Sequence, residues 1–353
     1  MTEPVTDINA SRSDAVSGPC PRIAVVVPIL NEAESLGPTL RALKAQDYPN
    51  EQLEIVIVDG GSQDGWRAVV VAADDGTIPI RVLDNPKRTT AAGVNLALKS
   101  TTADAVLWIS GHCVLAPDYI RKIATAFSEQ PLQVVGGRLA VRGYGVVGRL
   151  NAMLLASRFG TGTAPLRFGE DEGWTRTVTY TVWDREHLLK VGGLDERFHR
   201  NQDIDLIVRL KQDGVRFRRV DTEAIYLAPG SFGGIRRRAF WNGAWNIWGQ
   251  RLRRGGLSWW HFAPMAMVGL GVVLAVGSLW STGALFALAV LAGIYGVLAV
   301  GSAVTIAAQH RAWWGIPVLP FLFFVHHVVY GLGSWFALLR PVPSRPGSAG
   351  DHG

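Results

Sequence analysis

Several side chains that can do chemistry follow short apolar runs in this sequence. They are Glu32, Asp59, the basic pair Lys87 and Arg88, and His112. Carboxylates accept hydrogen bonds and take up protons, basic side chains bind phosphate oxygens, and histidine binds divalent metals. Together these residue types can hold a phosphate-containing ligand and move a proton.

The apolar runs are predicted to be strands that place these side chains at one edge of a sheet. Their continuous apolarity is typical of strands buried on both faces. The predicted strands cover residues 23–27, 54–58, 80–83 and 105–109; predicted helices run through Leu36 and Leu43, and over 66–73 and 89–99. This alternation predicts a Rossmann-like, doubly wound α/β sheet, in which ligands bind beyond the carboxyl ends of the strands.

The following 120 or so residues, by a rough count, are less regular. A strand is predicted over 133–141, helices over 146–159, 185–191 and 203–213, and a mobile glycine-rich loop over 161–173. Together with the first half this predicts one α/β domain over residues 22–230. Residues 1–21 are polar, do not form a signal peptide and are predicted to be a disordered tail, as are residues 341–353.

Residues 261–340 are predicted to be a membrane region. Residues 262–308 contain no charged side chain, whereas a membrane helix needs about 20 apolar residues. Two spans fit near 263–280 and 283–307, and a third segment covers 315–339. Helices buried inside a soluble protein are the alternative, and the length of the apolar runs disfavours it.

Arginines near the spans predict their orientation. Arg251, Arg253 and Arg254 precede the first span and Arg311 follows the second, which places the large domain in the cytoplasm. Three spans put the C-terminal tail and its arginines outside, whereas a re-entrant third segment keeps the tail inside.

Residues 231–260 are predicted to form an amphipathic helix at the membrane interface. Trp241, Trp245, Trp248 and Leu252 share one helical face and have arginines on both sides, which is typical of a helix with Trp at headgroup depth. Packing of this helix on the soluble domain is the alternative.

The charge distribution separates the two halves of the chain. Nine of the 35 Lys and Arg lie beyond Glu223, but only one of the 29 Asp and Glu does. Because the basic residues border apolar spans, they indicate anionic membrane lipids as a partner rather than nucleic acid. The two cysteines, Cys20 and Cys113, do not predict a disulfide framework.

Four sequence motifs resemble those of glycosyltransferase family 2. They read VVVPILNE at 25–32, VIVDGGSQDG at 56–65, GGLDE at 192–196 and NQDIDL at 201–206. The resemblance covers about residues 23–227, and within the family it is greatest to succinoglycan-type, membrane-bound transferases of exopolysaccharide assembly. It implies a GT-A fold, a nucleotide-sugar donor and inverting transfer.

The resemblance also implies a set of nucleotide-sugar-binding residues. They are Pro28, Asn31, Glu32, Asp59, Asp64, Lys87, Arg88, Asn95, Ser110 and Gly111. Asp59 is expected to accept the imide N–H of uracil, or to be a helix cap. Asp64 can instead cap the helix at 66–73, and Lys87 and Arg88 can be a solvated basic turn.

The family places an Asp-x-Asp that holds a divalent ion after the fourth strand, and this chain has Ser110, Gly111 and His112 there. Such an ion neutralises the leaving diphosphate. His112 is the expected metal ligand and favours Mn²⁺ over Mg²⁺ because imidazole is softer than carboxylate. The alternative is a neutral His112, with Lys87 or Arg88 supplying the positive charge.

Asp203 is the expected catalytic base, because it matches the acidic motif that the family uses to deprotonate the acceptor hydroxyl. Gln202 replaces the usual Glu and should lower the pKa of Asp203. Asp203 can also cap the following helix. Gln202 and Trp183 are expected on the acceptor side; Trp183, with Trp174 and Tyr180, either stacks on sugars or belongs to the core.

These expectations describe an inverting glycosyltransferase that moves a sugar, expected to be UDP-linked, onto a lipid-linked saccharide at the cytoplasmic face of the inner membrane. A processive polysaccharide synthase and a polyprenyl-phosphate sugar synthase are the nearest alternatives. A non-catalytic membrane scaffold is the alternative of another class, since fold does not fix function.

Overall fold

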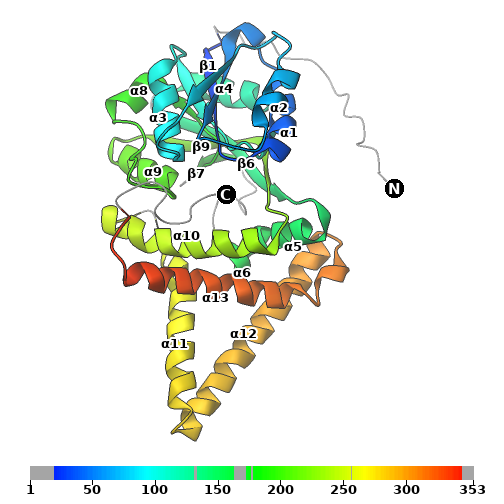
Figure 1. The fold of residues 1–353 in the computed structure, drawn as a ribbon, viewed down its shortest axis with the longest axis vertical. Helices are drawn as coiled ribbons and strands as arrows, with labels where there is room; N and C mark the ends of the chain where they lie inside the picture. Colours follow the sequence, from blue (N-terminus) through cyan, green and yellow to red (C-terminus); the bar gives the residue numbers. More distant parts are fainter. Residues whose placement is uncertain (1–19, 131–132, 163–171, 176–177, 256, 344–353) are drawn as a thin grey trace.

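The computed structural model describes residues 20–343, except 131–132, 163–171, 176–177 and 256. An α/β domain lies above a base of long helices (Figure 1). The two predicted terminal tails lie almost wholly outside the described residues, as does most of the loop predicted over 161–173.

The first half of the α/β domain has the predicted alternation. The strands are β1 (Ile23–Ile29), β2 (Leu53–Asp59), β3 (Ile80–Asp84) and β4 (Ala105–Trp108), and the helices are α1 (Ala33–Lys44), α2 (Trp66–Ala73) and α3 (Thr90–Ser100). β1 pairs in parallel with both β2 and β4, and β2 pairs in parallel with β3. The doubly wound prediction is confirmed for this half.

The second half makes the sheet mixed. It adds β5 (Cys113–Leu115), α4 (Tyr119–Glu129), β6 (Gln133–Arg142), β7 (Gly173–Thr175), β8 (Val182–Asp184), α8 (Arg185–Lys190), α9 (Gln202–Gln212) and β9 (Arg216–Leu227). The strand order is β3-β2-β1-β4-β8-β6-β9-β5, with β7 beside β9. The sequence analysis did not predict β9, because its charged residues, three of them arginines, interrupt the apolar pattern.

Two apolar layers enclose the sheet. Leu36 and Leu40 of α1, with Ile120 of α4, pack on one face, and Val94 of α3 with Leu206 of α9 packs on the other. Because both faces are buried, the carboxyl ends of β1, β2 and β4 are the part of the sheet left open to a ligand.

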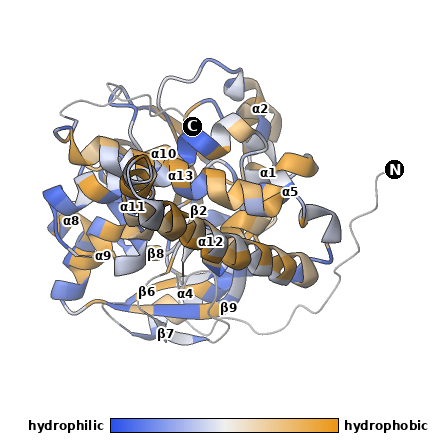
Figure 2. Ribbon diagram, turned by 90° about the horizontal axis from the view of Figure 1, so that it is seen from below, coloured by the Kyte–Doolittle hydropathy of each residue, from blue (hydrophilic) through white to orange (hydrophobic). Residues whose placement is uncertain are grey.

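The helical base consists of α5 (Gly145–Ala156), α6 (Arg158–Thr161), α10 (Phe232–Leu252), α11 (Ala263–Gly277), α12 (Thr282–Gln309) and α13 (Leu319–Leu338). Short 3₁₀ turns cover Asn50–Gln52, Trp259–Phe262 and Trp313–Gly315. Among the described residues, three helices are long and apolar enough to cross a membrane, namely Trp259–Gly277, Thr282–Gln309 and Leu319–Leu338. α11 and α12 project away from the α/β domain as a hairpin (Figure 1), and both are hydrophobic along their length (Figure 2).

α13 lies alongside α10 (Figure 1), and it also contacts α11 through Trp335, which donates to the Met265 carbonyl, and α12 through His327, which hydrogen-bonds Tyr295. A Cβ on Gly243 of α10 would meet the Tyr330 carbonyl, and one on Gly333 of α13 would meet the Phe240 carbonyl, each at 2.0 Å. Small residues at these crossings let the two backbones touch, which is how apolar helices associate closely. Arg251 donates to the carbonyls of Ala337 at 2.9 Å and Leu338 at 2.7 Å, capping the end of α13.

This packing corrects the expected position of the tryptophan face of α10. Trp245 and Trp248 are 0% and 2% exposed, so they do not lie at headgroup depth. Trp248 packs against Phe336 of α13, and Trp245 against His199 of the α/β domain. The helical spacing predicted one shared face correctly, but tertiary contacts with protein cover that face.

Candidate active site

One large cavity joins the open end of the sheet to the helical base. Its volume is about 1550 Å³, and its wall runs from the end of β1 past α9 and α10 to the first turns of α11. The expected site residues that line it are Pro28, Asn31, Glu32, Asp64, Arg88, Ser110, His112, Trp183, Gln202 and Asp203. Asp59, Lys87, Asn95 and Gly111 are not among its lining residues.

Backbone strain is concentrated around this cavity. Among the described non-glycine residues with positive φ, four line it, namely Asn31 (55°), Arg88 (59°), Tyr180 (49°) and Asn201 (61°). Such conformations cost about 1–3 kcal/mol each and persist where the surroundings hold them, typically at functional sites. The clustering supports the cavity as the functional site independently of its residue types.

The loops after β1 and β2 hold each other in place. Asn31 donates its backbone N–H to Ser62 Oγ and accepts from the Gln63 N–H, both at 2.8 Å. Asp59 is buried and accepts from the Ser62 N–H at 2.9 Å, so it closes this turn and is not a helix cap. Asp64 accepts from the Ala33 N–H at 2.7 Å; it caps α1 and not the helix at Trp66.

Glu32 and His112 form a hydrogen-bonded pair at the ends of β1 and β4. His112 Nδ1 lies 2.8 Å from Glu32 Oε1; since a carboxylate only accepts, Nδ1 is the donor, and in the neutral imidazole Nε2 is then the nitrogen with the lone pair. Glu32 Oε2 is buried without a hydrogen-bond partner among the described residues. A Cβ on Gly111 would lie 2.1 Å from this oxygen, so Gly111 makes room for the Glu32 carboxylate and does not line the cavity.

Ser110 is held by tyrosine and not by a cation. Its Oγ lies 2.9 Å from the Tyr180 hydroxyl, and the Tyr180 carbonyl accepts from the Tyr119 hydroxyl at 2.7 Å. Burial raises the pKa of Tyr180 well above its ordinary value, so its hydroxyl keeps its proton and supplies a neutral hydrogen bond beside His112.

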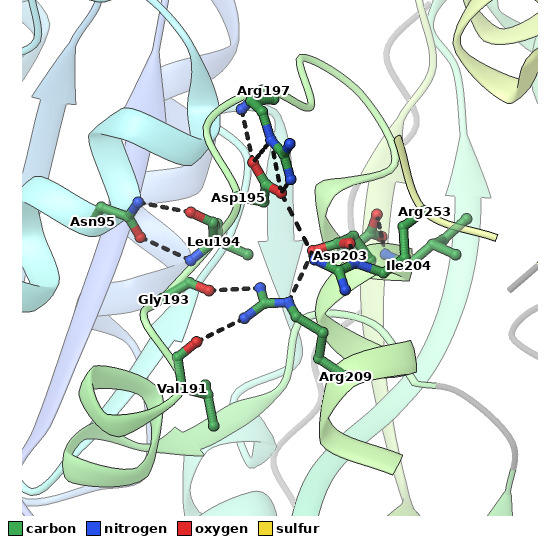
Figure 3. Close-up of polar contacts among 11 residues, drawn as sticks. Asn95, Val191, Gly193, Leu194, Asp195, Arg197, Asp203, Ile204, Arg209 and Arg253 are labelled. Atoms are coloured by element: carbon green, nitrogen blue, oxygen red, sulfur yellow. Dashed lines mark hydrogen bonds and ion pairs between the residues drawn. The ribbon is translucent and has the colours of Figure 1, made fainter. Parts of the chain in front are cut away.

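Lys87 and Asn95 support the turn over residues 192–196. Lys87 pairs with Glu196 at 2.7 Å, which directs its charge away from the cavity. The Asn95 side chain donates to the Leu194 carbonyl and accepts from the Leu194 N–H, both at 2.8 Å (Figure 3). The expectation that these two side chains contact the nucleotide sugar finds no support in this arrangement, because both are engaged elsewhere.

Asp203 lies on the first turn of α9, at the wall of the cavity. Its side chain reaches solvent in the cavity but is surrounded by protein, and this burial raises its pKa above the ordinary value despite a hydrogen bond from the Ile204 N–H at 2.9 Å. The expected lowering by Gln202 is outweighed by desolvation. The N-cap of α9 is Asn201, so Asp203 is not the capping residue.

The neighbouring Asp205 anchors α9 instead of facing the cavity. Its side chain is 0% exposed and pairs with Arg209 at 3.0 Å and with Arg253. Arg209 also donates to the carbonyls of Val191 and Gly193, at 2.9 and 2.6 Å (Figure 3). A buried carboxylate with two arginine partners fixes α9 against the turn over 192–196.

Trp183 belongs to the core. It is 3% exposed, and its ring stacks on Trp108 with centroids 4.9 Å apart and planes inclined by 10°. Tyr180 is half-buried and hydrogen-bonds Ser110 through its hydroxyl, and the Arg216 guanidinium lies 3.4 Å from the centroid of the Trp174 ring. Stacking of these rings on a sugar is therefore not supported. Gln202 does line the cavity, and its Oε1 is buried without a hydrogen-bond partner among the described residues.

A hydrogen-bonded chain connects the helical base to the strained residue before Gln202 and Asp203. The Asn201 side chain donates to Asn246 Oδ1 of α10 at 2.9 Å, and the Asn246 amide donates to the Tyr330 hydroxyl of α13. Because Asn201 is strained, this chain holds the backbone that aims Asp203. No sequence pattern signalled Asn246 or Tyr330, since they lie 45 and 129 positions from Asn201.

Replacing Asn246 with Leu is expected to lower kcat by about tenfold, because two hydrogen bonds of about 1 kcal/mol each are lost. KM for the donor should be unchanged. Tyr330→Phe removes only the distal bond and should give a smaller loss. Steady-state kinetics with a melting curve for each variant test this, and an unchanged kcat in the Leu variant would show that Asn201 needs no support from α10.

Glu32 and His112 carry donor atoms of the kind that bind a divalent metal. No group of three or more His, Cys, Asp or Glu placed to bind a metal occurs in the described part of the chain. A carboxylate that orients an imidazole through Nδ1, leaving Nε2 available, is however a common metal-binding arrangement. Mn²⁺ and Mg²⁺ sites on diphosphates need only one or two protein ligands, so the pair fits such an ion.

Comparisons with known proteins support the same class of molecule. Residues 24–243 match the family model described as Glycosyl transferase family 2. The chain is 28% identical over 329 residues to the succinoglycan biosynthesis protein ExoA of Rhizobium meliloti, covering 89% of this chain and 94% of that protein. It is 27% identical over 209 residues to the pre-mycofactocin glycosyltransferase of Mycobacterium tuberculosis, covering 57% of this chain and 42% of that protein.

A solved structure is similar in fold. The mannosyltransferase PcManGT from Pyrobaculum calidifontis, in complex with GDP-Man and Mn²⁺, superposes with a TM-score of 0.55 at 18% identity. The match covers 93% of this chain and 89% of that one. The similarity confirms the predicted GT-A fold.

Proposed function

The chain belongs to glycosyltransferase family 2 and is a glycosyltransferase, and from this premise we propose that it transfers a sugar from a nucleotide-sugar donor to a lipid-linked saccharide. The transfer inverts the anomeric carbon, and UDP is the expected nucleotide. The similarity to ExoA supports a role in exopolysaccharide or cell-envelope glycan synthesis.

The observation that carries this proposal is the course of the cavity. One end contains Glu32 and His112 at the carboxyl ends of strands, where α/β sheets bind ligands. The other end contains Ala263 and Met267 of α11, a helix apolar enough to cross a membrane. Asp203 lies on the wall between them, which suits a donor arriving from water and an acceptor arriving from lipid.

Asp203 is the proposed base. Its raised pKa makes the carboxylate a stronger proton acceptor than an ordinary aspartate, and this suits removal of a proton from a hydroxyl. The Asn201 and Asp205 contacts hold the α9 turn, so the base is positioned before the acceptor binds. Gln202 lines the cavity next to Asp203, and its side chain is proposed to contact the acceptor.

Glu32 and His112 would hold a divalent ion, Mn²⁺ in preference to Mg²⁺. The ion, when bound, neutralises charge on the leaving nucleoside diphosphate. Glu32 fixes the tautomer of His112 through Nδ1, and Gly111 admits the carboxylate. Arg88, on a strained turn at the same edge, is placed to contact phosphate oxygens.

The proposed location is the inner membrane, with the catalytic domain in the cytoplasm, as the arginines before α11 and after α12 indicate. The α11–α12 hairpin would cross the bilayer. Leu319, the first residue of α13, belongs to the same apolar cluster as Met153 of α5, and Arg251 of α10 caps the end of α13. Since both ends contact the base, this supports the alternative in which the third apolar segment does not cross and the C-terminal tail stays inside.

The purified full chain in detergent should convert one member of a panel of radiolabelled nucleotide sugars into an organic-soluble product when membrane lipid extract and Mn²⁺ are present. Omission of the extract is the control. Polymer formation would indicate a processive synthase, and transfer to bare polyprenyl phosphate would indicate a polyprenyl-phosphate sugar synthase. Absence of turnover with every donor would favour the non-catalytic scaffold.

A further inference from the structure

The charges that line the cavity are separated along its length. The acidic lining residues are Glu32, Glu34, Asp64 and Asp203. Apart from Asp203, they lie around the start of α1, at the nucleotide end. The other charged lining residues among the described part of the chain are arginines, namely Arg88 before α3, Arg158 of α6, Arg200 before α9, and Arg237 and Arg238 of α10, so all but Arg88 come from the helical base or from the turn before α9.

We propose that the arginines of the membrane-side half, with Arg237 and Arg238 at their centre, bind the phosphoryl head group of the lipid-linked acceptor, and that its hydrocarbon chain leaves along the first turns of α11. The proposal rests on the proposed function, because it assigns a subsite within the same cavity. Arginine suits this role since its guanidinium donates in a planar fork to phosphate oxygens.

The position of Arg238 places this subsite close to the donor. The Arg238 guanidinium lies 4.6 Å from the centre of the Tyr226 ring and donates to the Tyr226 hydroxyl. His112 meets the same ring edge-on, with centroids 4.9 Å apart. A phosphoryl group held at Arg238 is thus one aromatic ring away from the pair proposed to face the donor diphosphate, and the attached sugar can reach Asp203.

The route for the hydrocarbon chain is apolar. The lining contributed by residues 257–267 is apolar except for His261, namely Leu257, Trp260, Ala263, Pro264 and Met267, while His326, His327 and Tyr330 of α13 add polar groups to the lining. The apolar window of the span that contains α11 is 0% buried by protein, so its outer face is available to lipid. A cationic patch that continues into such a wall matches a ligand with an anionic head and an apolar tail, and this distinguishes a lipid phosphate from free phosphate.

The donor diphosphate is the competing source of phosphoryl groups. In the proposed function it lies at the other end of the cavity, where Arg88 is on a strained turn between β3 and α3. The lipid phosphate and the donor diphosphate predict different effects of mutation. If the α10 arginines bind the lipid phosphate, their loss should weaken binding of the lipid ligand and leave nucleotide binding unchanged.

Equilibrium binding of radiolabelled farnesyl diphosphate to the full chain in detergent micelles tests the proposal, with UDP, inorganic pyrophosphate and farnesol measured in parallel. The Arg237→Ala variant is expected to bind farnesyl diphosphate at least about tenfold more weakly and UDP within about twofold of wild type. Arg236→Ala is the matched control, since Arg236 is exposed but does not line the cavity. The Met267→Asp substitution should weaken the binding of farnesyl diphosphate and leave the binding of pyrophosphate unchanged.

Arg237 is exposed, so its replacement should leave the fold intact, and a melting curve checks this. Equal loss of UDP and farnesyl diphosphate would assign the arginines to the donor and overturn the proposal. If the wild type bound pyrophosphate and farnesyl diphosphate with equal affinity, the proposed path for the hydrocarbon chain along α11 would be rejected. Failure of farnesyl diphosphate to bind an enzyme that still turns over a nucleotide sugar would reject this subsite alone, whereas absence of turnover and of UDP binding would reject the proposed function.

Discussion

An Asp203→Asn variant is expected to lose kcat by about 10²–10⁴-fold, the usual contribution of a positioned general base. The amide has nearly the same shape but cannot take the proton of the acceptor hydroxyl. KM for the nucleotide sugar should change little, because the side chain lies on the acceptor side of the cavity. Steady-state kinetics with donor and acceptor varied separately provide the measurement.

The dependence of kcat on pH separates a catalytic role of Asp203 from a structural one, because a structural role would not shift it. Asp203 acts as a base only when deprotonated, so kcat should fall as pH drops through its pKa, which burial raises above that of an ordinary aspartate. Gln202→Glu places a second carboxylate beside it and should raise this pKa further. The acidic limb of the profile is therefore expected to move to higher pH in that variant.

Asp213→Asn, at the far end of α9 and exposed, is the matched control and should retain full activity. A fully active Asp203→Asn variant would reject the base assignment. An acidic limb that does not respond to Gln202→Glu would show that another group controls the profile.

The second large effect is expected at the Glu32–His112 pair. His112→Ala should lower kcat/KM by about 10²-fold, because it removes the proposed metal ligand and its help to the leaving diphosphate. The Glu32→Gln variant keeps the imidazole but no longer fixes its tautomer. Loss of a carboxylate that orients a metal-binding histidine typically lowers metal affinity by about 10–100-fold. The Glu32→Gln loss should therefore be recovered at high Mn²⁺, and the His112→Ala loss should not.

Activity measured over a range of Mn²⁺ concentrations, and after treatment with a chelator, distinguishes the two roles of the pair. Glu34→Gln is the control, since Glu34 also lines the cavity whereas Glu32 is the carboxylate that pairs with His112. Full activity of the wild type in chelator would exclude the metal, and His112 would then act as a neutral hydrogen-bonding group.

The sequence alone predicted the first four strands and the apolar helices. These elements have continuous apolar runs, and burial on both faces of a sheet or in lipid makes composition sufficient to identify them. The chemistry-bearing positions at the ends of β1 and β4 were predictable for the same reason, because parallel strands end at one edge, whereas Asp203 at the start of α9 was predicted from its match to the family's acidic motif.

Which of those side chains reach the ligand depended on tertiary structure. Asn95 and Lys87 have the right residue types at the right sheet edge, but the turn over 192–196 takes up their hydrogen bonds. Asp64, in the loop after β2, caps α1, the helix that follows β1. Local patterns cannot predict such contacts, since each partner lies about 30 to 110 positions away in the chain.

By itself, then, the sequence determined that a Rossmann-like sheet with polar strand ends is joined to apolar helices. Only the tertiary structure decided that Glu32 holds His112, that Asn246 and Tyr330 support Asn201, and that protein covers the tryptophans of α10. The physical reason is that periodicity reports which face of an element is buried, whereas the partner that buries it is chosen by packing between segments distant in sequence.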